Sequence, residues 1–328
     1  PAGTTEFTIR ESNLTDSSTV ISGPYEKAVG NDDAVFLGAT GSLGNLIYHE
    51  IIDVERSPGF VVEGGAGYDW IRIDYNVSPF VSGQTYEPTA GGPGGFSTGV
   101  EVHGQGGDDI IYGGLDNDRL FGGEGDDLIA TWDGNDVHHG GAGNDTLGSN
   151  DFFFGKNQTE GANFDVTADD FYFGGAGKDF ITDDWGNDTA FGDEGSDFIA
   201  TGSGADTVFG GDGDDVIYSD RRFSGFHGER SWTLFYDGKG RPVNVNLFSM
   251  TFQGEALQAG GDYIDGGAGS DLILSGKGDD TVLGGSGNDA INAQSGDDYV
   301  DGGDDDDLIF GEDGFDVLAG GKGEDSIH

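Results

Sequence analysis

The sequence predicts an all-β repeat solenoid, and three observations support this fold class. Residues 257–328 divide without remainder into eight consecutive nonapeptides. Each of these nonapeptides has Asp at its sixth position and an aliphatic residue at its eighth. Glycine occurs 65 times in the 328 residues, whereas proline occurs seven times. A fixed period of nine with these features indicates stacked repeats, each of which buries its apolar side against its neighbours.

One nonapeptide, GGSGNDAIN at 284–292, shows why such a repeat bends and then extends. Its first six residues are turn formers, because glycine adopts a positive φ at little steric cost. Its last three residues predict a short strand, in which Ile291 points inward and Ala290 and Asn292 point outward. Two nonapeptides therefore make one coil, and stacked coils form two parallel sheets around a thin aliphatic core.

Nineteen nonapeptides occur in the chain, and all of them keep Asp at position six. They lie in four groups, at 64–72, 104–148, 174–218 and 257–328. We predict an N-terminal β region or cap at 1–63, then a first repeat with a Gly/Pro-rich loop at 64–103, then a repeat domain at 104–328. Two insertions, at 149–173 and 219–256, interrupt that domain. Residues 1–63 are either degenerate coils or a separate small β-sandwich, and both alternatives stay open.

The charge of the chain excludes several classes of partner. Sixty-two acidic residues against 14 basic ones give a net charge of −48. Nucleic acid is excluded because its binding requires Lys and Arg to displace counterions. Membrane insertion is excluded because no apolar run approaches the roughly 18 residues of a membrane helix. The lack of cysteine excludes disulfides and thiolate metal sites.

A cation is needed to hold such a repeat together. One aliphatic side chain per nonapeptide is a small core for nine ordered residues, and stacked aspartates repel one another. Carboxylate and carbonyl oxygens are hard ligands, and no His/Cys set for zinc or copper accompanies them. Ca²⁺ accepts six to eight oxygens in flexible geometry, whereas Mg²⁺ demands a tighter octahedron. The pattern therefore predicts Ca²⁺.

The nonapeptides resemble the RTX (repeats-in-toxin) family, whose consensus is G-G-x-G-x-D-x-U-x with U aliphatic. GGAGSDLIL at 266–274 and GGSGNDAIN at 284–292 fit it throughout, and VNVNL at 243–247 resembles a segment often found before such repeats. The resemblance covers about half of the chain. It implies a parallel β-roll with Ca²⁺ between the turns of adjacent coils, with about 10–16 ions in all. It also implies an extracellular or cell-surface product of a Gram-negative bacterium, exported by a type I system and folded by external Ca²⁺.

The resemblance assigns the metal to the position-six carboxylates, helped by carbonyl groups of the glycine-rich turns. These aspartates are Asp69, Asp109, Asp118, Asp127, Asp136, Asp145, Asp179, Asp188, Asp197, Asp206, Asp215, Asp262, Asp271, Asp280, Asp289, Asp298, Asp307, Asp316 and Asp325.

Some features depart from the consensus. We expect weaker or lost sites at turns where another residue replaces a leading or position-four glycine, as at Asp116, Asp305, Asp183-Asp184 and Thr131-Trp132. RTX proteins usually carry an export signal after the repeats, and this chain stops at the end of a repeat. Either truncation or a different export route is therefore expected.

The second insertion is basic and aromatic. It contains five of the 14 basic residues, namely Arg221, Arg222, Arg230, Lys239 and Arg241. YDGKG at 236–240 predicts a hairpin turn between 232–236 and 242–247. The hairpin either folds back onto the solenoid and pairs with its carboxylates or contacts a glycan or protein partner.

Two stripes of Phe occupy outer strand positions, at Phe180 and Phe198 and at Phe191 and Phe209. These stripes are either covered or form a contact surface.

No catalytic residue is predicted, and we do not expect an enzyme. H-E-x-x-H is absent from the sequence, and His138-His139 fits packing better than a transition-metal site. The leading hypothesis is a secreted or cell-surface Ca²⁺-binding structural or adhesive protein, with self-association or a surface glycan or protein partner. The alternative is the Ca²⁺-binding repeat region of a larger RTX enzyme or toxin. A third hypothesis is a β-helical polysaccharide-active enzyme that uses residues 1–103.

Overall fold

The computed structural model describes a β-solenoid. The described residues are 35–38, 47–52, 60–66, 69–74, 100–113, 117–131, 134–149, 168–183, 185–224, 231–248, 251–255 and 260–328. Every regular element among them is a β-strand, as the sequence predicts for an all-β fold. None of the described residues forms a helix that could cross a membrane.

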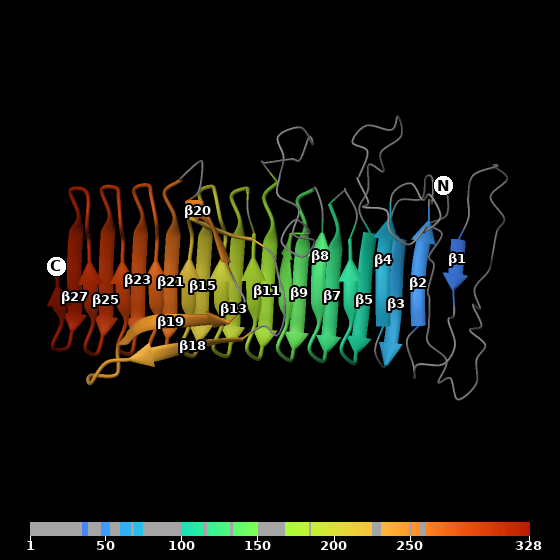
Figure 1. Ribbon diagram of the computed structural model, residues 1–328, viewed down its shortest axis with the longest axis horizontal. Coiled ribbons are helices and arrows are strands. Elements are labelled where there is room, and N and C mark those ends of the chain that lie inside the picture. Colours follow the sequence, from blue (N-terminus) through green and yellow to red (C-terminus); the bar gives the residue numbers. More distant parts are fainter. Residues whose placement is uncertain are drawn as a thin grey trace, which may run out of the picture.

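Two long sheets face each other along the whole solenoid (Figure 1). In order across the sheet, the thirteen-stranded sheet contains β1 (Val35–Gly38), β2 (Ile47–Ile52), β4 (Asp69–Asp74), β6 (Ile110–Tyr112), β8 (Leu128–Thr131), β10 (Thr146–Ser149), β12 (Phe180–Thr182), β14 (Phe198–Ala200), β16 (Val216–Tyr218), β22 (Leu272–Leu274), β24 (Ala290–Asn292), β26 (Leu308–Phe310) and β28 (Ser326–Ile327). The eleven-stranded sheet contains β3 (Phe60–Ala66), β5 (Val100–Gly106), β7 (Arg119–Glu124), β9 (Val137–Ala142), β11 (Phe171–Ala176), β13 (Thr189–Glu194), β15 (Thr207–Asp212), β21 (Tyr263–Ala268), β23 (Thr281–Ser286), β25 (Tyr299–Asp304) and β27 (Val317–Lys322).

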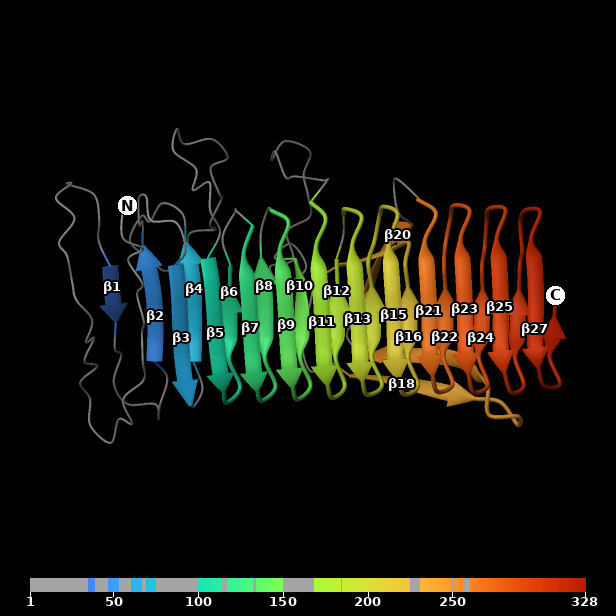
Figure 2. The same ribbon diagram turned by 180° about the vertical axis from the view of Figure 1, so that it is seen from behind.

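From β2 onward, successive strands of the solenoid alternate between the two sheets, so each pair of nonapeptides makes one coil (Figure 2). Successive coils pair in parallel and in the register of the repeat, as Ile273 opposite Ile291 illustrates. β2 pairs in parallel with β4, and β3 pairs in parallel with β5, so strands before residue 64 already continue both sheets. Only β1, at one end, pairs antiparallel with β2 among the strands of these two sheets that the structure describes.

The core is one column of position-eight side chains between the sheets. Its members are buried and contact one another from coil to coil: Val102, Ile111, Leu120, Ile129, Leu147, Tyr172, Ile181, Ala190, Ile199, Val208, Ile217, Ile264, Ile273, Val282, Ile291, Val300 and Ile309, joined by Ala293. This confirms the predicted β-roll, in which the residue at position eight points inward and is aliphatic in most nonapeptides. His138 also occupies position eight and is fully buried.

The first insertion is shorter than the sequence predicts. We predicted an insertion at 149–173, yet residues 168–173 continue the solenoid, and β11 pairs with β9 on one side and β13 on the other. The residues that close this turn are Ala168, Asp169 and Asp170, so a twentieth repeat lies inside the predicted insertion. The sequence conceals it because Tyr172 replaces the aliphatic residue and the leading glycines are missing.

The second insertion leaves the solenoid from inside a turn. Ser219 still belongs to the coil, because its amide donates to the carbonyl of Leu274 in the next coil. The same coil resumes at Gly260 and Gly261 before Asp262. Residues between them form two small antiparallel pairs, β17 (Arg221–Ser224) with β20 (Thr251–Glu255) and β18 (Ser231–Tyr236) with β19 (Pro242–Phe248). The predicted hairpin is thus β18–β19.

The outer faces of the two sheets differ. On the thirteen-stranded sheet Phe180 and Phe198 are buried, in a cluster that includes Leu234 from β18. On the eleven-stranded sheet six rings stack in a row with centroids 4.5–5.0 Å apart, namely His103, Phe121, His139, Phe173, Phe191 and Phe209. These six rings, called the aromatic ladder below, are partly exposed. The hairpin therefore contributes to covering one Phe stripe, while the other stays accessible.

Candidate metal centre

The position-six aspartates form two columns, one along each edge of the roll. Each column begins a strand of one sheet, so the edges differ in the residues at position one. On one edge, called the glycine edge, position one is Gly104, Gly122, Gly140, Gly174, Gly192, Gly210, Gly266, Gly284, Gly302 and Gly320. On the other edge, called the hydroxyl edge, position one between Gly113 and Gly311 is Thr131, Ser149, Asp183, Thr201, Ser219, Ser275 and Ala293.

A ladder of hydrogen bonds links the aspartates of each column. The backbone amide of each donates to Oδ1 of the aspartate one coil further on, at 2.7–3.1 Å. The acceptors are Asp127, Asp136, Asp145, Asp170, Asp179, Asp188, Asp197, Asp206, Asp215, Asp262, Asp271, Asp280, Asp289, Asp298, Asp307, Asp316 and Asp325. The ladder includes Asp170, which the sequence prediction missed, and it crosses both insertions without a gap.

A second ladder runs through position five in the opposite direction. There the backbone amide donates to a side-chain oxygen of position five in the preceding coil, at 2.7–3.2 Å. The acceptors are Asp108, Asn117, Asp126, Asn144, Asp169, Asn187, Ser196, Asp214, Ser270, Asp279, Asn288, Asp297 and Asp306. The sequence analysis missed this role, although the frequency of Asp, Asn and Ser at position five signals it.

The second carboxylate oxygen, Oδ2, is buried and has no hydrogen-bond partner in aspartates of both edges. On the glycine edge these are Asp127, Asp145, Asp179, Asp197, Asp215, Asp271, Asp289 and Asp307, and on the hydroxyl edge Asp136, Asp188, Asp206, Asp262, Asp280 and Asp298. A buried carboxylate oxygen without a donor costs free energy that a bound cation would recover.

The glycine at position one leaves room beside this oxygen. A Cβ on Gly284 would lie within 2.5 Å of both Asp289 Oδ2 and the carbonyl oxygen of Gly302 in the next coil. Any side chain here would therefore overlap these two oxygens. The same arrangement repeats along the glycine edge. Position one of these repeats is therefore always glycine, and a carboxylate oxygen and a carbonyl oxygen lie beside it.

On the hydroxyl edge, side chains occupy the equivalent position. The hydroxyl of Ser275 donates to the carbonyl of Ala293 in the next coil at 2.9 Å. The hydroxyls of Ser219 and Thr201 donate in the same way to the carbonyls of Ser275 and Ser219. A position-one carbonyl that has no side-chain hydroxyl beside it on the glycine edge therefore accepts a hydroxyl hydrogen bond on the hydroxyl edge.

Burial raises the pKa of position-six carboxyls on both edges, among them Asp206, Asp262, Asp215 and Asp289. Desolvation raises the pKa of Asp289 and of Asp215 to about 9, and in both cases the charge of Asp271 adds to the shift. Desolvation raises the pKa of Asp145 to about 8. Without a cation, these groups therefore favour protonation at neutral pH. A divalent ion would replace those protons.

The predicted ligands occupy equivalent places, with a few exceptions. Asp316 and Asp325, in the last coil, are partly exposed. Several predicted positions lie outside the described residues, namely Asp116, Trp132, Asp184 and the loop at 75–99. The side chain of Asp69 is also outside them. Asp305, at position four, adopts a φ of 83°, a conformation that glycine takes in regular repeats.

His138 is a packed core residue, as the sequence analysis expects. Its Nε2 lies 3.0 Å from Thr131 Oγ1, and its ring meets Tyr172 edge-on at 4.8 Å. Burial, together with the neighbouring His139, lowers its pKa to about 3, so the ring is neutral.

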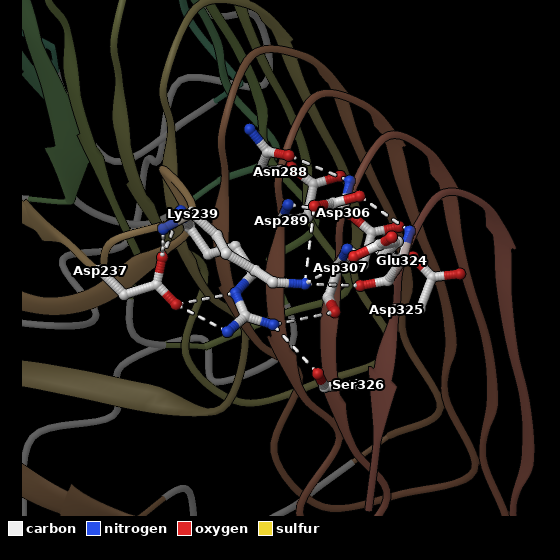
Figure 3. Close-up of polar contacts among 10 residues, drawn as sticks. Asp237, Lys239, Asn288, Asp289, Asp306, Asp307, Glu324, Asp325 and Ser326 are labelled. Carbon is white, nitrogen blue, oxygen red and sulfur yellow. Dashed lines mark hydrogen bonds and ion pairs between the residues drawn. The ribbon is translucent and has the colours of Figure 1, made fainter.

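The tip of the hairpin lies on the glycine edge (Figure 3). Lys239 Nζ donates to the carbonyl of Glu324 at 3.0 Å and lies 3.6 Å from Asp306 Oδ2. Arg241 donates to Ser326 Oγ at 3.2 Å, while Asp237 accepts from two of its guanidinium nitrogens. The hairpin therefore folds back onto the roll and pairs with its acidic groups.

The donors of the turns suit a hard cation. Buried carboxylate oxygens without donors and glycine carbonyls converge at each turn of the glycine edge, while described nitrogen and sulfur ligands are absent from these turns. Ca²⁺ prefers oxygen ligands from carboxylates and carbonyls. The residues of these turns therefore fit Ca²⁺.

Comparison with known proteins agrees with this chemistry. The family model of the RTX calcium-binding nonapeptide repeat matches in overlapping copies at 101–120, 112–147, 166–199, 191–221, 258–291, 276–309, 283–318 and 292–327. These matches cover more than half of the chain and include the repeat of Asp170. No curated protein matches the sequence. The chain belongs to the RTX calcium-binding nonapeptide repeat family and is a Ca²⁺-binding repeat protein.

Proposed function

We propose that this protein is a secreted or cell-surface structural or adhesive scaffold whose roll folds when Ca²⁺ binds at its turns. The single observation that carries the proposal is the column of buried Oδ2 atoms without hydrogen donors on the glycine edge. The position-six aspartates and the carbonyl groups of the turns hold the ions. Bound Ca²⁺ supplies positive charge that neutralises these carboxylates and joins each coil to the next.

The net charge supports folding that depends on the ion. Forty-eight excess negative charges oppose any compact state, and the thin core contributes one side chain per repeat. Each divalent ion removes two of those charges. Extracellular Ca²⁺ sites bind at roughly 10⁻⁴–10⁻³ M. The chain therefore stays unfolded at low Ca²⁺ and folds at the concentration outside a cell.

Circular dichroism of the chain in EGTA and in millimolar Ca²⁺ tests this function. We expect a cooperative gain of β signal and a smaller hydrodynamic radius as Ca²⁺ is added. Mg²⁺ at the same concentration is the matched control and should leave the chain unfolded, because Mg²⁺ keeps its water. Equal β content in EGTA and in Ca²⁺ would refute the proposal.

The aromatic ladder supports a structural or adhesive role. Its six rings, four of Phe and two of His, form a partly exposed aromatic row on a protein that is otherwise strongly acidic. Such a row provides a contact surface for another molecule. Membership in the repeat family also supports export from a Gram-negative bacterium.

The runner-up function is the Ca²⁺-binding repeat region of a larger RTX enzyme or toxin. Sequencing the complete reading frame separates the two, since an adjoining catalytic or pore-forming domain favours the runner-up.

A further inference from the structure

A group of buried acidic side chains lies where the hydroxyl edge departs from its pattern. Asp183 occupies position one of its repeat, where the neighbouring repeat on this edge has Thr201. One carboxylate oxygen from each of Asp170, Asp183 and Asp188 lies within 4.8 Å of the others. Their exposed fractions are only 4%, 5% and 1%. Three carboxylates thus share one buried space.

The described hydrogen donors to this group are one phenol and two backbone amides beside the ladder bond from Asp136. The phenol of Tyr172 donates to Asp183 and lies 3.1 Å from Asp170 Oδ2. Backbone amides donate to the other oxygens, from Asp170 to Asp188 Oδ1 at 2.9 Å and from Trp185 to Asp183 Oδ1 at 3.2 Å. Asp188 Oδ2 has no hydrogen-bond partner, although it is buried beside the other two carboxylates.

A fourth carboxylate adds to the negative charge. Asp136 stands one coil before Asp170, is fully buried, and donates its amide to Asp170 Oδ1 at 2.7 Å. Burial, then the charge of Asp118 and more weakly that of Asp183, raise the pKa of Asp136. Like charges at such close range in a buried place require protons or a cation.

We propose that Asp170, Asp183 and Asp188 form a cation site that holds a hard ion mainly by side-chain carboxylates and binds it more tightly than the regular turns. Affinity for hard cations rises with the number of charged ligands. Regular turns offer no carboxylate at position one, whereas this turn adds that of Asp183. Tyr172 orients two of the three carboxylates. The inference rests on the proposed calcium-binding turns, of which this turn is a variant with an added charge.

Terbium luminescence tests the site in the full chain. Tb³⁺ replaces Ca²⁺ at oxygen sites and emits when a neighbouring aromatic ring is excited, and Tyr172 and Trp185 lie at this site. With the chain folded in millimolar Ca²⁺, Tb³⁺ should give an emission phase that saturates near one ion per chain. Asp183→Gly removes the added carboxylate and gives this turn the position-one glycine of the RTX consensus, and it should weaken that phase at least about tenfold.

Asp193→Gly is the matched control. It also removes one carboxylate and introduces glycine, at position two of the next repeat, where φ is 72°. We expect it to keep the tight phase. If Asp183→Gly does not fold in Ca²⁺, Asp183→Asn keeps the side-chain shape and should show the same loss. A tight phase unchanged in the Asp183 variant, an equal loss in both glycine variants, or no tight phase in the natural chain would overturn the inference. Failure of the proposed function appears separately, as a natural chain that gains no β structure in Ca²⁺.

Discussion

The two edges of the roll stabilise the same turn in different ways. On the glycine edge, position one has no side chain, and Asp289 Oδ2 and the carbonyl of Gly302 border the space beside Gly284. On the hydroxyl edge, Ser275 fills the equivalent place and donates to the carbonyl of Ala293 at 2.9 Å. On the hydroxyl edge the hydroxyl already satisfies that carbonyl, so a cation there would meet the unpartnered Oδ2 atom, whereas on the glycine edge it would meet both the Oδ2 atom and the carbonyl.

The hairpin adds to the contrast. Its described polar contacts with the turns all fall on the glycine edge, from Asp214, which accepts from Tyr236 at 2.5 Å, to Asp306 and Glu324 beside Lys239. A basic hairpin thus covers the edge that carries open oxygen-lined turns. The difference shows that one nonapeptide motif supports two kinds of turn, depending on whether position one has a side chain.

Lowering the pH should stabilise the Ca²⁺-free turns of both edges alike, because it protonates the buried carboxylates of both. We expect this to be the largest of the effects on folding. The folded pKa of Asp289 is about 9 and that of Asp206 about 8, both far above the unfolded value of 3.8. Because the folded pKa is raised, this stability is fully present below pH 3.8 and is lost as pH rises toward 9. Each such group contributes at most about 1.4 kcal/mol per pH unit.

We therefore expect a Ca²⁺-free chain to gain β structure between pH 7.5 and pH 5, measured by circular dichroism. The Ca²⁺-loaded chain at pH 7.5 is the reference for full folding. A Ca²⁺-free chain that is equally unfolded at both pH values contradicts the raised pKa values of both edges.

Exchanging position one between the edges tests the steric difference. Gly284→Ser places a side chain on Asp289 Oδ2 and on the Gly302 carbonyl, which should cost about 1–3 kcal/mol. The reciprocal Ser275→Gly loses one buried hydrogen bond, which should cost about 0.5–1.5 kcal/mol. Urea unfolding in saturating Ca²⁺ measures both. Equal losses, or a larger loss from Ser275→Gly, would mean that the edges do not differ in this way.

Asp289→Asn isolates the carboxylate charge on the glycine edge. Asn keeps the acceptor for the Asp271 amide at 2.9 Å but carries no charge. We expect the variant to bind Ca²⁺ about tenfold more weakly at this turn, equivalent to about 1.4 kcal/mol. At neutral pH without Ca²⁺, it should be slightly more stable than the natural chain. Ca²⁺ titration followed by circular dichroism reports the midpoint. A midpoint equal to that of the natural chain would exclude Asp289 as a ligand.

Arg241→Gln should have the smallest effect. The guanidinium is held by Asp237 and reaches Ser326 in the last coil, so its loss removes one contact of the hairpin tip with the roll and leaves those of Lys239. Partly exposed ion pairs contribute little to stability and weaken with salt. Thermal unfolding in Ca²⁺ at low and high salt measures the change. Arg119→Gln, on the outer face of the eleven-stranded sheet, is the control and should leave the last coils unaffected. A loss that does not shrink at high salt would argue against an ionic contact.

Sequence reasoning succeeded where the repeat is regular and failed where it is interrupted. The period of nine was sufficient to predict Ile273 and Ile291 as inward residues and Asp271 and Asp289 as turn residues. It missed Asp170, because the repeat of this residue has Tyr172 at position eight and lacks leading glycines. Position five was also missed, because a side chain that accepts a hydrogen bond from the next coil looks like an ordinary polar residue in the sequence.

By itself, the sequence determined the all-β class, the coil of two nonapeptides, the aliphatic core and the acidic oxygen-rich turns. These follow from local rules, since glycine permits the turn and alternation sends one residue in three inward. Only the tertiary structure decided which turns align on which edge, how the chain re-enters the roll after each insertion, and that Asp183 meets Asp170 and Asp188. Such contacts depend on stacking between residues 18 or more apart, and an insertion changes that separation without changing the local motif.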